Sequence, residues 1–214
     1  MTPERVEAVP VVFVIDDDTS LRETLLSLFR SVGLQAEGFA SPAEFLRRPR
    51  SDLRGCMVLD VRLPGLSGLE FQSDLAKSNV SIPVIFMTGH GDIPMSVRAM
   101  KAGAVEFLTK PFREQDMLDA VQLALEKDRG RVEAEEQSSE VKTNFASLSP
   151  REQEIMGLVT AGLMNKQIAG ETGLSDVTVK IHRGNVMRKM GAKSLADLVR
   201  MAEVVGATPS RNNT

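Results

Sequence analysis

The sequence predicts an open α/β domain with a five-stranded parallel sheet, followed by a smaller all-α domain. Apolar runs alternate with amphipathic helical patterns over residues 10–127, which is typical of a parallel sheet covered by helices on both faces. Beyond residue 147 every segment has a helical period. The net charge changes as well: it is −5 over residues 1–128 (14 basic against 19 acidic side chains), −1 over 129–146 (3 against 4) and +3 over 147–214 (9 against 6), within a total of −3. An acidic first part and a basic last part indicate two tasks on one chain.

Five short runs predict the strands of the first domain. In chain order they are residues 11–15, 35–39, 56–59, 84–87 and 105–109. Most of them are rich in Val, Ile, Leu, Phe or Met, as expected of parallel strands that are buried on both faces. A domain of this size favours the flavodoxin-like arrangement with strand order 2-1-3-4-5 and right-handed crossovers.

Helical patterns fill the segments between the strands. Thr19-Ser20 is the candidate N-cap of the first helix, and Gly33 marks its end. Ser41-Pro42 predicts the start of the second helix, with Phe45 and Leu46 facing the core. The remaining patterns cover residues 66–75, residues 94–102 and a helix that begins at Phe112.

The segment 128–146 is rich in charged residues and poor in apolar ones, so we expect a linker, helical in pattern, with Gly130 as its weak point. The predicted domains are therefore 10–127 and 147–206. The second domain should hold four helices: between Ser149 and Gly162, from Lys166 to Thr172, from Ser175 to about Met190, and over 195–205. Ser149 and Asn165 are the candidate N-caps of the first two.

Polar side chains follow four of the predicted strands where each strand ends. Asp16-Asp17-Asp18 follow the first, Asp60 the third, Thr88 the fourth and Lys110 the fifth. The carboxyl ends of parallel strands share one edge of a sheet, where open α/β folds bind ligands. Carboxylates, a hydroxyl and an ammonium group in one crevice indicate a site for phosphate and a hard metal ion such as Mg²⁺.

The chemistry assigns a role to each group. Crowded carboxylates repel one another unless a cation relieves them, and Mg²⁺ prefers oxygen ligands. Asp60 can act as a nucleophile toward phosphorus and form an acyl phosphate, while Lys110 and Thr88 can stabilise the phosphoryl oxygens. A single acid at a strand end more often belongs to a loop or a helix cap, which is what we expect of Asp18. The coincidence at four strand ends favours a site.

These motifs resemble the receiver domain of response regulators. The matching segments are V-I-D-D-D (14–18), L-D-V-R-L-P-G-L-S-G (59–68), F-M-T-G-H (86–90) and A-M-K-A-G-A-V-E-F-L-T-K-P-F (99–112). The resemblance implies that Asp60 accepts phosphate from a sensor histidine kinase. It also implies a set of Mg²⁺ ligands: Asp16, Asp17, Asp60 and the backbone carbonyl of Arg62.

The same resemblance implies that Thr88 and Lys110 contact the phosphoryl oxygens and that the Lys110-Pro111 bond is cis. Phe107 takes the place of the aromatic switch residue, and plain core packing explains it equally well. Many family members carry Tyr there, and Phe107 departs from them by lacking the phenol hydroxyl.

The helix predicted over residues 176–190 is basic and amphipathic. At 100° per residue Val179, Val186 and Met190 form its core stripe. The opposite side carries Val177, Lys180, Ile181, Gly184 and Arg188. Five basic residues and no acid lie between Lys180 and Lys193. A short helix, a turn and a basic helix indicate a helix-turn-helix.

Three segments resemble the LuxR/NarL-type DNA-binding domain: L-S-P-R-E (148–152), G-L-M-N-K-Q-I-A (162–169) and L-S-D-V-T-V-K-I-H-R-G-N-V-M-R-K-M-G (174–191). The whole chain resembles FixJ/NarL response regulators, above all the FixJ-like branch. The resemblance places Lys180, Ile181 and Gly184 in the major groove, where Lys180 can reach guanine and Ile181 a thymine methyl. Gly184 departs from the polar or basic residue often found there. Further candidate DNA contacts, chiefly to phosphates, are Asn165, Lys166, Thr178, Arg183, Arg188 and Lys189.

Together the resemblances predict a two-component transcriptional regulator that dimerises on phosphorylation, binds promoter DNA and works with RNA polymerase. Two alternatives stay open: an enzyme of the phosphatase kind with an aspartyl-phosphate intermediate, and a DNA-binding regulator that needs no phosphorylation. The absence of a second acid two residues after Asp60 counts against the first, and the intact strand-end residues count against the second.

Composition bounds the location of the protein. Cys56 is the only cysteine, so no intrachain disulfide can form. The first ten residues lack the apolar core of a signal peptide, and no run reaches the roughly 20 apolar residues that cross a bilayer. We therefore expect a cytoplasmic protein without a membrane partner.

Overall fold

The computed structural model describes residues 9–49, 53–78, 80–89 and 93–207. The chain forms two compact units, Met1–Val132 and Glu133–Thr214, which are described one at a time.

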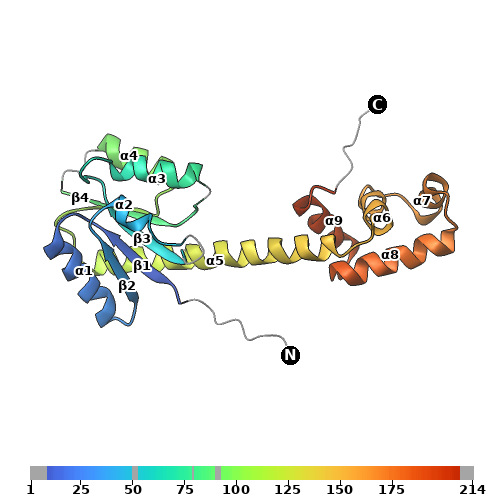
Figure 1. The fold of residues 1–214 in the computed structure, drawn as a ribbon, viewed down its shortest axis with the longest axis horizontal. Coiled ribbons are helices and arrows are strands. Elements are labelled where there is room, and N and C mark those ends of the chain that lie inside the picture. The colour runs from blue at the N-terminus through green and yellow to red at the C-terminus, as the bar shows by residue number, and fades with distance from the viewer. Residues whose placement is uncertain (1–8, 50–52, 79, 90–92, 208–214) are drawn as a thin grey trace. The chain divides into compact units, whose positions relative to one another are not determined.

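The first unit is built on one parallel sheet. Its strands are β1 (Val11–Ile15), β2 (Gln35–Phe39), β3 (Gly55–Asp60), β4 (Val84–Thr88) and β5 (Glu106–Thr109). They are ordered β2-β1-β3-β4-β5, which confirms the predicted flavodoxin-like order (Figure 1). The register pairs Ile15 with Leu59 and Asp60 with Met87, so neighbouring strands end at similar levels.

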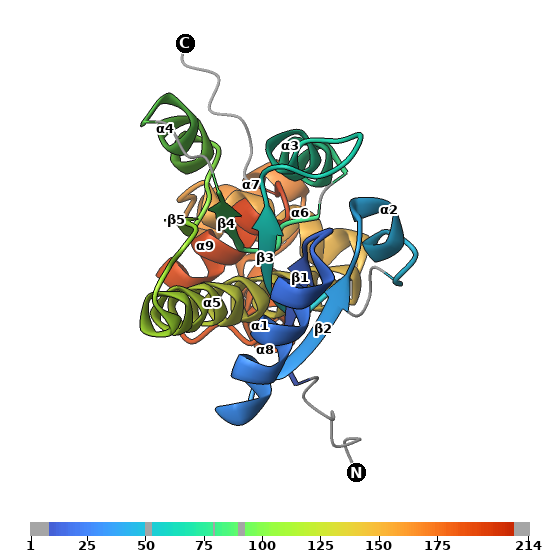
Figure 2. The same cartoon turned by 90° about the vertical axis from the view of Figure 1, so that its left-hand side faces the viewer.

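Helices cover both faces of this sheet. They are α1 (Thr19–Ser31), α2 (Pro42–Phe45), α3 (Gly68–Lys77), α4 (Ile93–Lys101) and α5 (Glu114–Ala146). α1 and the first part of α5 pack on one face, and α2, α3 and α4 lie on the other (Figure 2). β1 serves both cores, because Val12 and Val14 point to the first face while Phe13 and Ile15 point to the second.

Two local predictions in this unit were wrong, although the helix-cap role expected of Asp18 is confirmed. The N-cap of α1 is Asp18, whose carboxylate accepts the N–H groups of Ser20 (2.8 Å) and Leu21 (3.2 Å), so Thr19 and Ser20 lie inside the helix. A carboxylate there also interacts favourably with the helix dipole. Leu46 was expected in the core and is 55% exposed, because the helix ends at Phe45 and its buried residues are Pro42 and Phe45.

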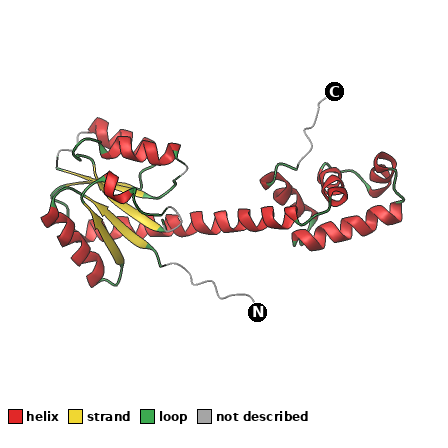
Figure 3. Ribbon diagram, in the orientation of Figure 1, coloured by secondary structure: helices red, strands yellow, loops and turns green. Residues whose placement is uncertain are grey.

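α5 runs without interruption through Gly130 to Ala146, so the segment expected to be a linker is helical. In the second unit the last turns of α5 contribute Val141 and Phe145 to the edge of a separate core. The other helices are α6 (Pro150–Thr160), α7 (Asn165–Thr172), α8 (Asp176–Met190) and α9 (Leu195–Val204), as Figure 3 shows. This confirms the predicted all-α domain with four helices after α5.

Asn165 is not the N-cap of α7, contrary to the prediction. The cap position is Met164, whose N–H is accepted by Gln167 Oε1 at 2.8 Å. Asn165 is the first helical residue, and its Oδ1 accepts a hydrogen bond from Arg183 of α8 at 3.1 Å. Ser149, by contrast, caps α6 as expected and forms a capping box with Glu152.

Candidate functional site

The carboxyl ends of β1, β3 and β5 bring three charged side chains into direct contact. Lys110 Nζ lies 2.8 Å from Asp16 Oδ2 and 2.6 Å from Asp60 Oδ2. Asp16 is fully buried and Asp60 is 7% exposed. Two carboxylates thus share one ammonium group, although Asp16 and Lys110 lie 94 residues apart in the chain.

Backbone groups fix the orientation of both carboxylates. The N–H of Asp18 donates to Asp16 Oδ1 at 2.8 Å, and the N–H of Arg62 donates to Asp60 Oδ1 at 2.8 Å. The Arg22 guanidinium donates to the backbone carbonyl of Asp16 at 2.6 Å. Each carboxylate therefore binds a backbone N–H through one oxygen and Lys110 through the other.

Asp17 completes an acidic cluster that can hold a divalent metal ion. One carboxylate oxygen from each of Asp16, Asp17 and Asp60 lies within 4.8 Å of the others, and Asp17 is exposed to solvent. The donors are all oxygen, which a hard cation such as Mg²⁺ prefers, and an exposed carboxylate leaves room for the waters that Mg²⁺ retains. The chemistry of the donor set therefore fits this ion.

Burial and pairing set the charges of the cluster. Burial raises the pKa of the Asp16 carboxyl above its ordinary value, against the hydrogen bond from Lys110, which lowers it. For Lys110, burial by itself lowers the pKa, but the hydrogen bonds to Asp16 and Asp60 outweigh it and the pKa lies above its ordinary value. Lys110 therefore remains an ammonium group at neutral pH.

Thr88 lies on β4, the strand next to Asp60, and Phe107 lies on β5, on the far side of β4. Thr88 is the last residue of β4 and is fully buried, and its carbonyl accepts the backbone N–H of Lys110 at 2.7 Å. The Phe107 ring, half-buried in β5, lies with its centroid 6.5 Å from that of Phe86. The Lys110-Pro111 bond is cis, as the resemblance implies.

One residue at this edge was missed by the sequence reasoning. Gly68, the first residue of α3, donates its N–H to the carbonyl of Val61 at 3.0 Å. A Cβ at this position would lie 2.4 Å from the carbonyl oxygen of Asp60. Only glycine allows α3 to start against the end of β3. The signal was available, since Gly68 closes the motif that begins at Leu59.

In the second unit, α8 has the two faces that its sequence predicts. Val179, Val186 and Met190 are buried in the core, and Ser175 caps the helix through the N–H of Thr178. The opposite face is exposed and carries Val177, Lys180, Ile181, Gly184 and Arg188. α7 packs against α8 through a short turn at Gly173, which takes the left-handed conformation that favours glycine.

The remaining candidate DNA contacts differ in how freely they can reach a ligand. Lys166 is exposed. Thr178 Oγ1 lies 2.8 Å from Ser175 Oγ, and Arg188 bonds Asn185 at 3.1 Å on the surface. Arg183 and Asn165 bond each other, as described above.

Lys189 is held by an acid of the domain core. Its Nζ lies 2.6 Å from Glu152 Oε2, and the Glu152 side chain is 6% exposed. This hydrogen bond and that of the Ser149 N–H hold the pKa of Glu152 below its ordinary value. Lys189 therefore bonds α8 to the start of α6, and its expected contact with DNA phosphate stays a prediction.

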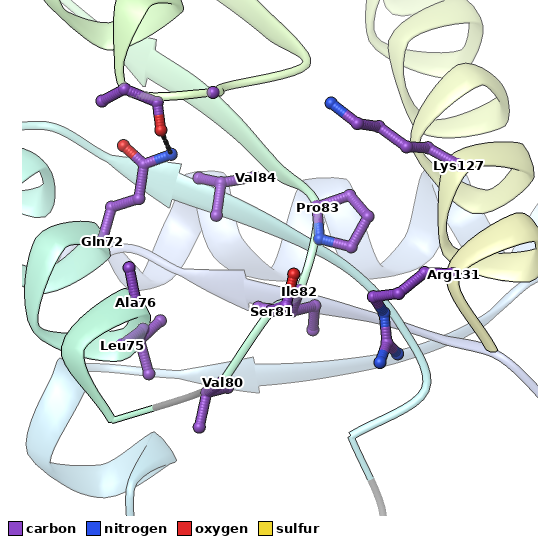
Figure 4. Close-up of a pocket in the computed structure, with 12 residues that line it drawn as sticks. Gln72, Leu75, Ala76, Val80, Ser81, Ile82, Pro83, Val84, Lys127 and Arg131 are labelled. Atoms are coloured by element: carbon purple, nitrogen blue, oxygen red, sulfur yellow. Dashed lines mark hydrogen bonds between the residues drawn. The ribbon is translucent and has the colours of Figure 1, made fainter. Parts of the chain in front are cut away.

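A cavity lies at the other edge of the first unit's sheet and shares no lining residue with the acidic cluster. It has a volume of about 580 Å³ and lies between the end of α3, the segment before β4 and α5 (Figure 4). Lys127 and Arg131 of α5 lie along one side (Figure 4). Arg131 is bonded to the buried carboxylate of Asp128 at 2.6 Å.

Comparison with known families covers both units. Residues 12–122 match the response regulator receiver domain, and residues 146–202 match the bacterial regulatory proteins of the luxR family. The chain belongs to the FixJ/NarL family of two-component response regulators. The receiver domain implies a histidine kinase as partner, and the LuxR-type domain implies binding to DNA.

Individual FixJ/NarL relatives extend along the whole chain. It is 58% identical to nodulation protein W of Bradyrhizobium diazoefficiens, over 95% of this chain and 89% of the relative. It is 48% identical to the response regulator protein TodT of Pseudomonas putida (90% and 85%) and 44% identical to the transcriptional regulatory protein FixJ of Azorhizobium caulinodans (97% and 98%). The protein is therefore a response regulator of two-component transcription control.

Solved structures of the family agree. The response regulator StyR matches with a TM-score of 0.80 at 51% identity, over 92% of this chain and 99% of that one. Full-length FixJ from B. japonicum matches with a TM-score of 0.55 at 39% identity (94% and 98%). Among the described residues, no helix is both long and apolar enough to span a bilayer.

Proposed function

We propose that Asp60 is the phosphoacceptor of this response regulator. A carboxylate oxygen of Asp60 attacks the phosphorus of a phosphohistidine on the kinase, so that a P–O bond forms and the P–N bond breaks. The observation that carries the proposal is the bridge of Lys110 between Asp60 and Asp16. That ammonium group is already in place to neutralise phosphoryl oxygens, and the buried Thr88 hydroxyl on the adjacent strand can donate to them.

Mg²⁺ is the metal ion we propose for the acidic cluster. Asp16, Asp17, Asp60 and the backbone carbonyl of Arg62 would hold it, and it would offset the negative charge of carboxylates and phosphate. The hydrogen bonds to the Asp18 and Arg62 N–H groups keep two of these carboxylates oriented for this task.

The output of phosphorylation would be a homodimer. α4 exposes three apolar side chains, Ile93 (80% exposed), Val97 (44%) and Met100 (44%). An apolar stripe of this kind favours association with a partner surface. Phe107 on the neighbouring β5 would link the state of Thr88 to this face, a change between two states that the phosphate biases.

The dimer would present two LuxR-type domains to promoter half-sites, with α8 in the major groove. RNA polymerase would be the further partner at the promoter, and the protein would act in the cytoplasm, where the chromosome lies. We place the receiver domain at residues 10–127, the helical linker at 128–146 and the DNA-binding domain at 147–206. Lys180, Ile181 and Gly184 would face the bases, with Lys166 and Arg188 toward the phosphates.

The test compares the wild type with Asp60→Asn, and with Asp74→Asn as control, since Asp74 is an exposed acid on α3. Each protein is incubated with acetyl phosphate and Mg²⁺ and followed by intact mass, light scattering and binding to promoter DNA. The wild type and Asp74→Asn should gain one phosphoryl group, dimerise and bind DNA more tightly, and Asp60→Asn should do none of these. Equal labelling of Asp60→Asn would refute the assignment.

The same experiment separates the alternatives. Rapid multiple turnover of an organic phosphate would favour an enzyme of the phosphatase kind. Tight DNA binding that is the same with and without acetyl phosphate would favour regulation independent of phosphorylation.

A further inference from the structure

The outward face of α8 carries two large aliphatic side chains that the core does not use. Val177 is 68% exposed and Ile181 is 60% exposed. Single exposed aliphatic residues are ordinary on protein surfaces. These two lie four residues apart on one helix, and positions i and i+4 are neighbours on the same face.

The helix geometry joins them into one strip. Side chains on a helix lean toward its N-terminus, so Ile181 lies over the turn that carries Val177. Lys180 is exposed beside them and forms no ion pair with another residue that the structure describes. The surface is therefore an apolar strip flanked by one available cation.

Gly184 leaves the next position along this face bare. A Cβ built there meets no heavy atom within 4 Å, so the packing of the domain does not require glycine. Glycine inside a helix lowers its stability relative to alanine. Because Gly184 has no side chain, the side of Ile181 that faces away from Val177 stays uncovered.

We propose that Val177 contacts the 5-methyl group of a thymine in each operator half-site, beside the thymine expected for Ile181 and the base pair expected for Lys180. This rests on the proposed DNA-binding function of α8 and adds Val177 to its readers. The thymine methyl is the apolar group that the major groove displays, and lysine pairs with guanine O6 or N7. Both aliphatic residues lie in the N-terminal half of α8, the part of a recognition helix that contacts base edges.

The protein is best tested as the full chain, phosphorylated with acetyl phosphate and Mg²⁺. A preferred site is first selected from random duplex DNA. Each thymine of a half-site is then replaced by deoxyuridine, which removes only the methyl group. Two thymines should each weaken wild-type binding about fourfold, the factor that corresponds to about 0.8 kcal/mol for one buried methyl.

The variants assign each methyl to a side chain. Val177→Ala should bind the thymine site more weakly and should no longer distinguish thymine from deoxyuridine at one of the two positions, and Ile181→Ala at the other. Val177→Thr, which replaces one of the two methyl groups by a hydroxyl at nearly equal volume, should keep part of the discrimination that Val177→Ala loses. Val32→Ala is the matched control, because Val32 is a 51% exposed valine of the first unit, and it should keep the wild-type pattern.

Two results would overturn the inference while leaving the proposed function intact: specific binding that is insensitive to deoxyuridine at every thymine, or Val177 variants that match the wild type at every position. A protein that selects no DNA sequence would instead remove the proposed DNA-binding function, and the inference with it. The melting temperature of each variant shows whether a loss of DNA binding is caused by unfolding. Because Val177 is exposed, we expect its variants to melt at the wild-type temperature.

Discussion

Asp128 joins α5 to the sheet through a buried hydrogen-bonded network, and its removal should destabilise the first unit. Asp128 is buried, with 3% of its surface exposed. Its Oδ2 accepts the backbone N–H of Gly55 at 2.7 Å, and its Oδ1 accepts Nε (3.0 Å) and Nη2 (2.6 Å) of Arg131. Gly55 is the first residue of β3, the strand that ends at Asp60, so the network connects that strand with the helix that leads out of the receiver domain.

Asp128→Ala removes all three bonds. The buried Gly55 N–H would lose its partner, at a cost of about 1–3 kcal/mol. Arg131 would lose a paired carboxylate, but its side chain is 22% exposed and water can replace part of that interaction, about 1 kcal/mol. The expected loss is about 3 kcal/mol, or a fall in melting temperature on the order of 10 °C for a domain of this size.

The assay must resolve the two units. The chain has no Trp or Tyr, so calorimetry and hydrogen exchange followed by mass spectrometry are suited to it. Asp128→Ala should lower the midpoint temperature of one calorimetric transition, that of the first unit, and should speed amide hydrogen exchange in residues 55–60 and 124–132. Asp119→Ala is the control, because this exposed acid of the same helix bonds only to Gln115 among the described residues and should change stability by less than about 0.5 kcal/mol. If both variants melt within about 2 °C of the wild type, the network contributes no such stability.

Two further predictions concern single contacts. Gly55→Ala should destabilise the first unit by on the order of 4 kcal/mol, because φ is +126° and a Cβ would lie 1.9 Å from the carbonyl oxygen of Val11. The control Gly130→Ala has open space around it and should stabilise α5 slightly. Equal denaturation midpoints for the two variants would contradict the prediction for Gly55. Glu152→Gln should flatten the acid dependence of the second unit. The ordinary pKa of a glutamate is 4.5, and the pKa of Glu152 in the folded protein is lower. Ionised Glu152 therefore stabilises the fold above about pH 4.5, and this stability is lost as the pH falls through the folded pKa. Parallel pH profiles of the melting temperature for the wild type and Glu152→Gln would refute the prediction.

The fold and the centre of the site could be predicted from the sequence because both follow from local patterns. Apolar runs identify strands, and the carboxyl ends of parallel strands must share an edge. Asp16, Asp60 and Lys110 could therefore be placed together without coordinates, whatever the number of residues between them. The helical wheel of α8 worked in the same way, since one period decides which side chains face the core.

The contacts that escaped prediction depend on the distance between elements rather than on a pattern. Asp128 lies in a segment whose composition indicated a solvated linker, and its partner Gly55 is 73 residues away. The close approach of Gly68 to Asp60 is likewise a property of packing. The N-cap of α1 was also placed wrongly at Thr19-Ser20. Neighbouring polar residues can accept hydrogen bonds from the same backbone N–H groups, and in the structure the carboxylate of Asp18 accepts them.

The number of basic residues in the sequence of α8 also overstates the positive charge that this helix exposes to solvent. Five basic residues between Lys180 and Lys193 predicted a basic helix, yet two of them are half-buried and are bonded within the domain. Lys189 pairs with Glu152, and Arg183 bonds Asn165. Both bonds connect α8 to other helices, so part of the positive charge holds α8 against the rest of its domain. The positive charge that stays exposed on this segment is that of Lys180, Arg188 and Lys193, which is less than the number of basic residues in the sequence indicates.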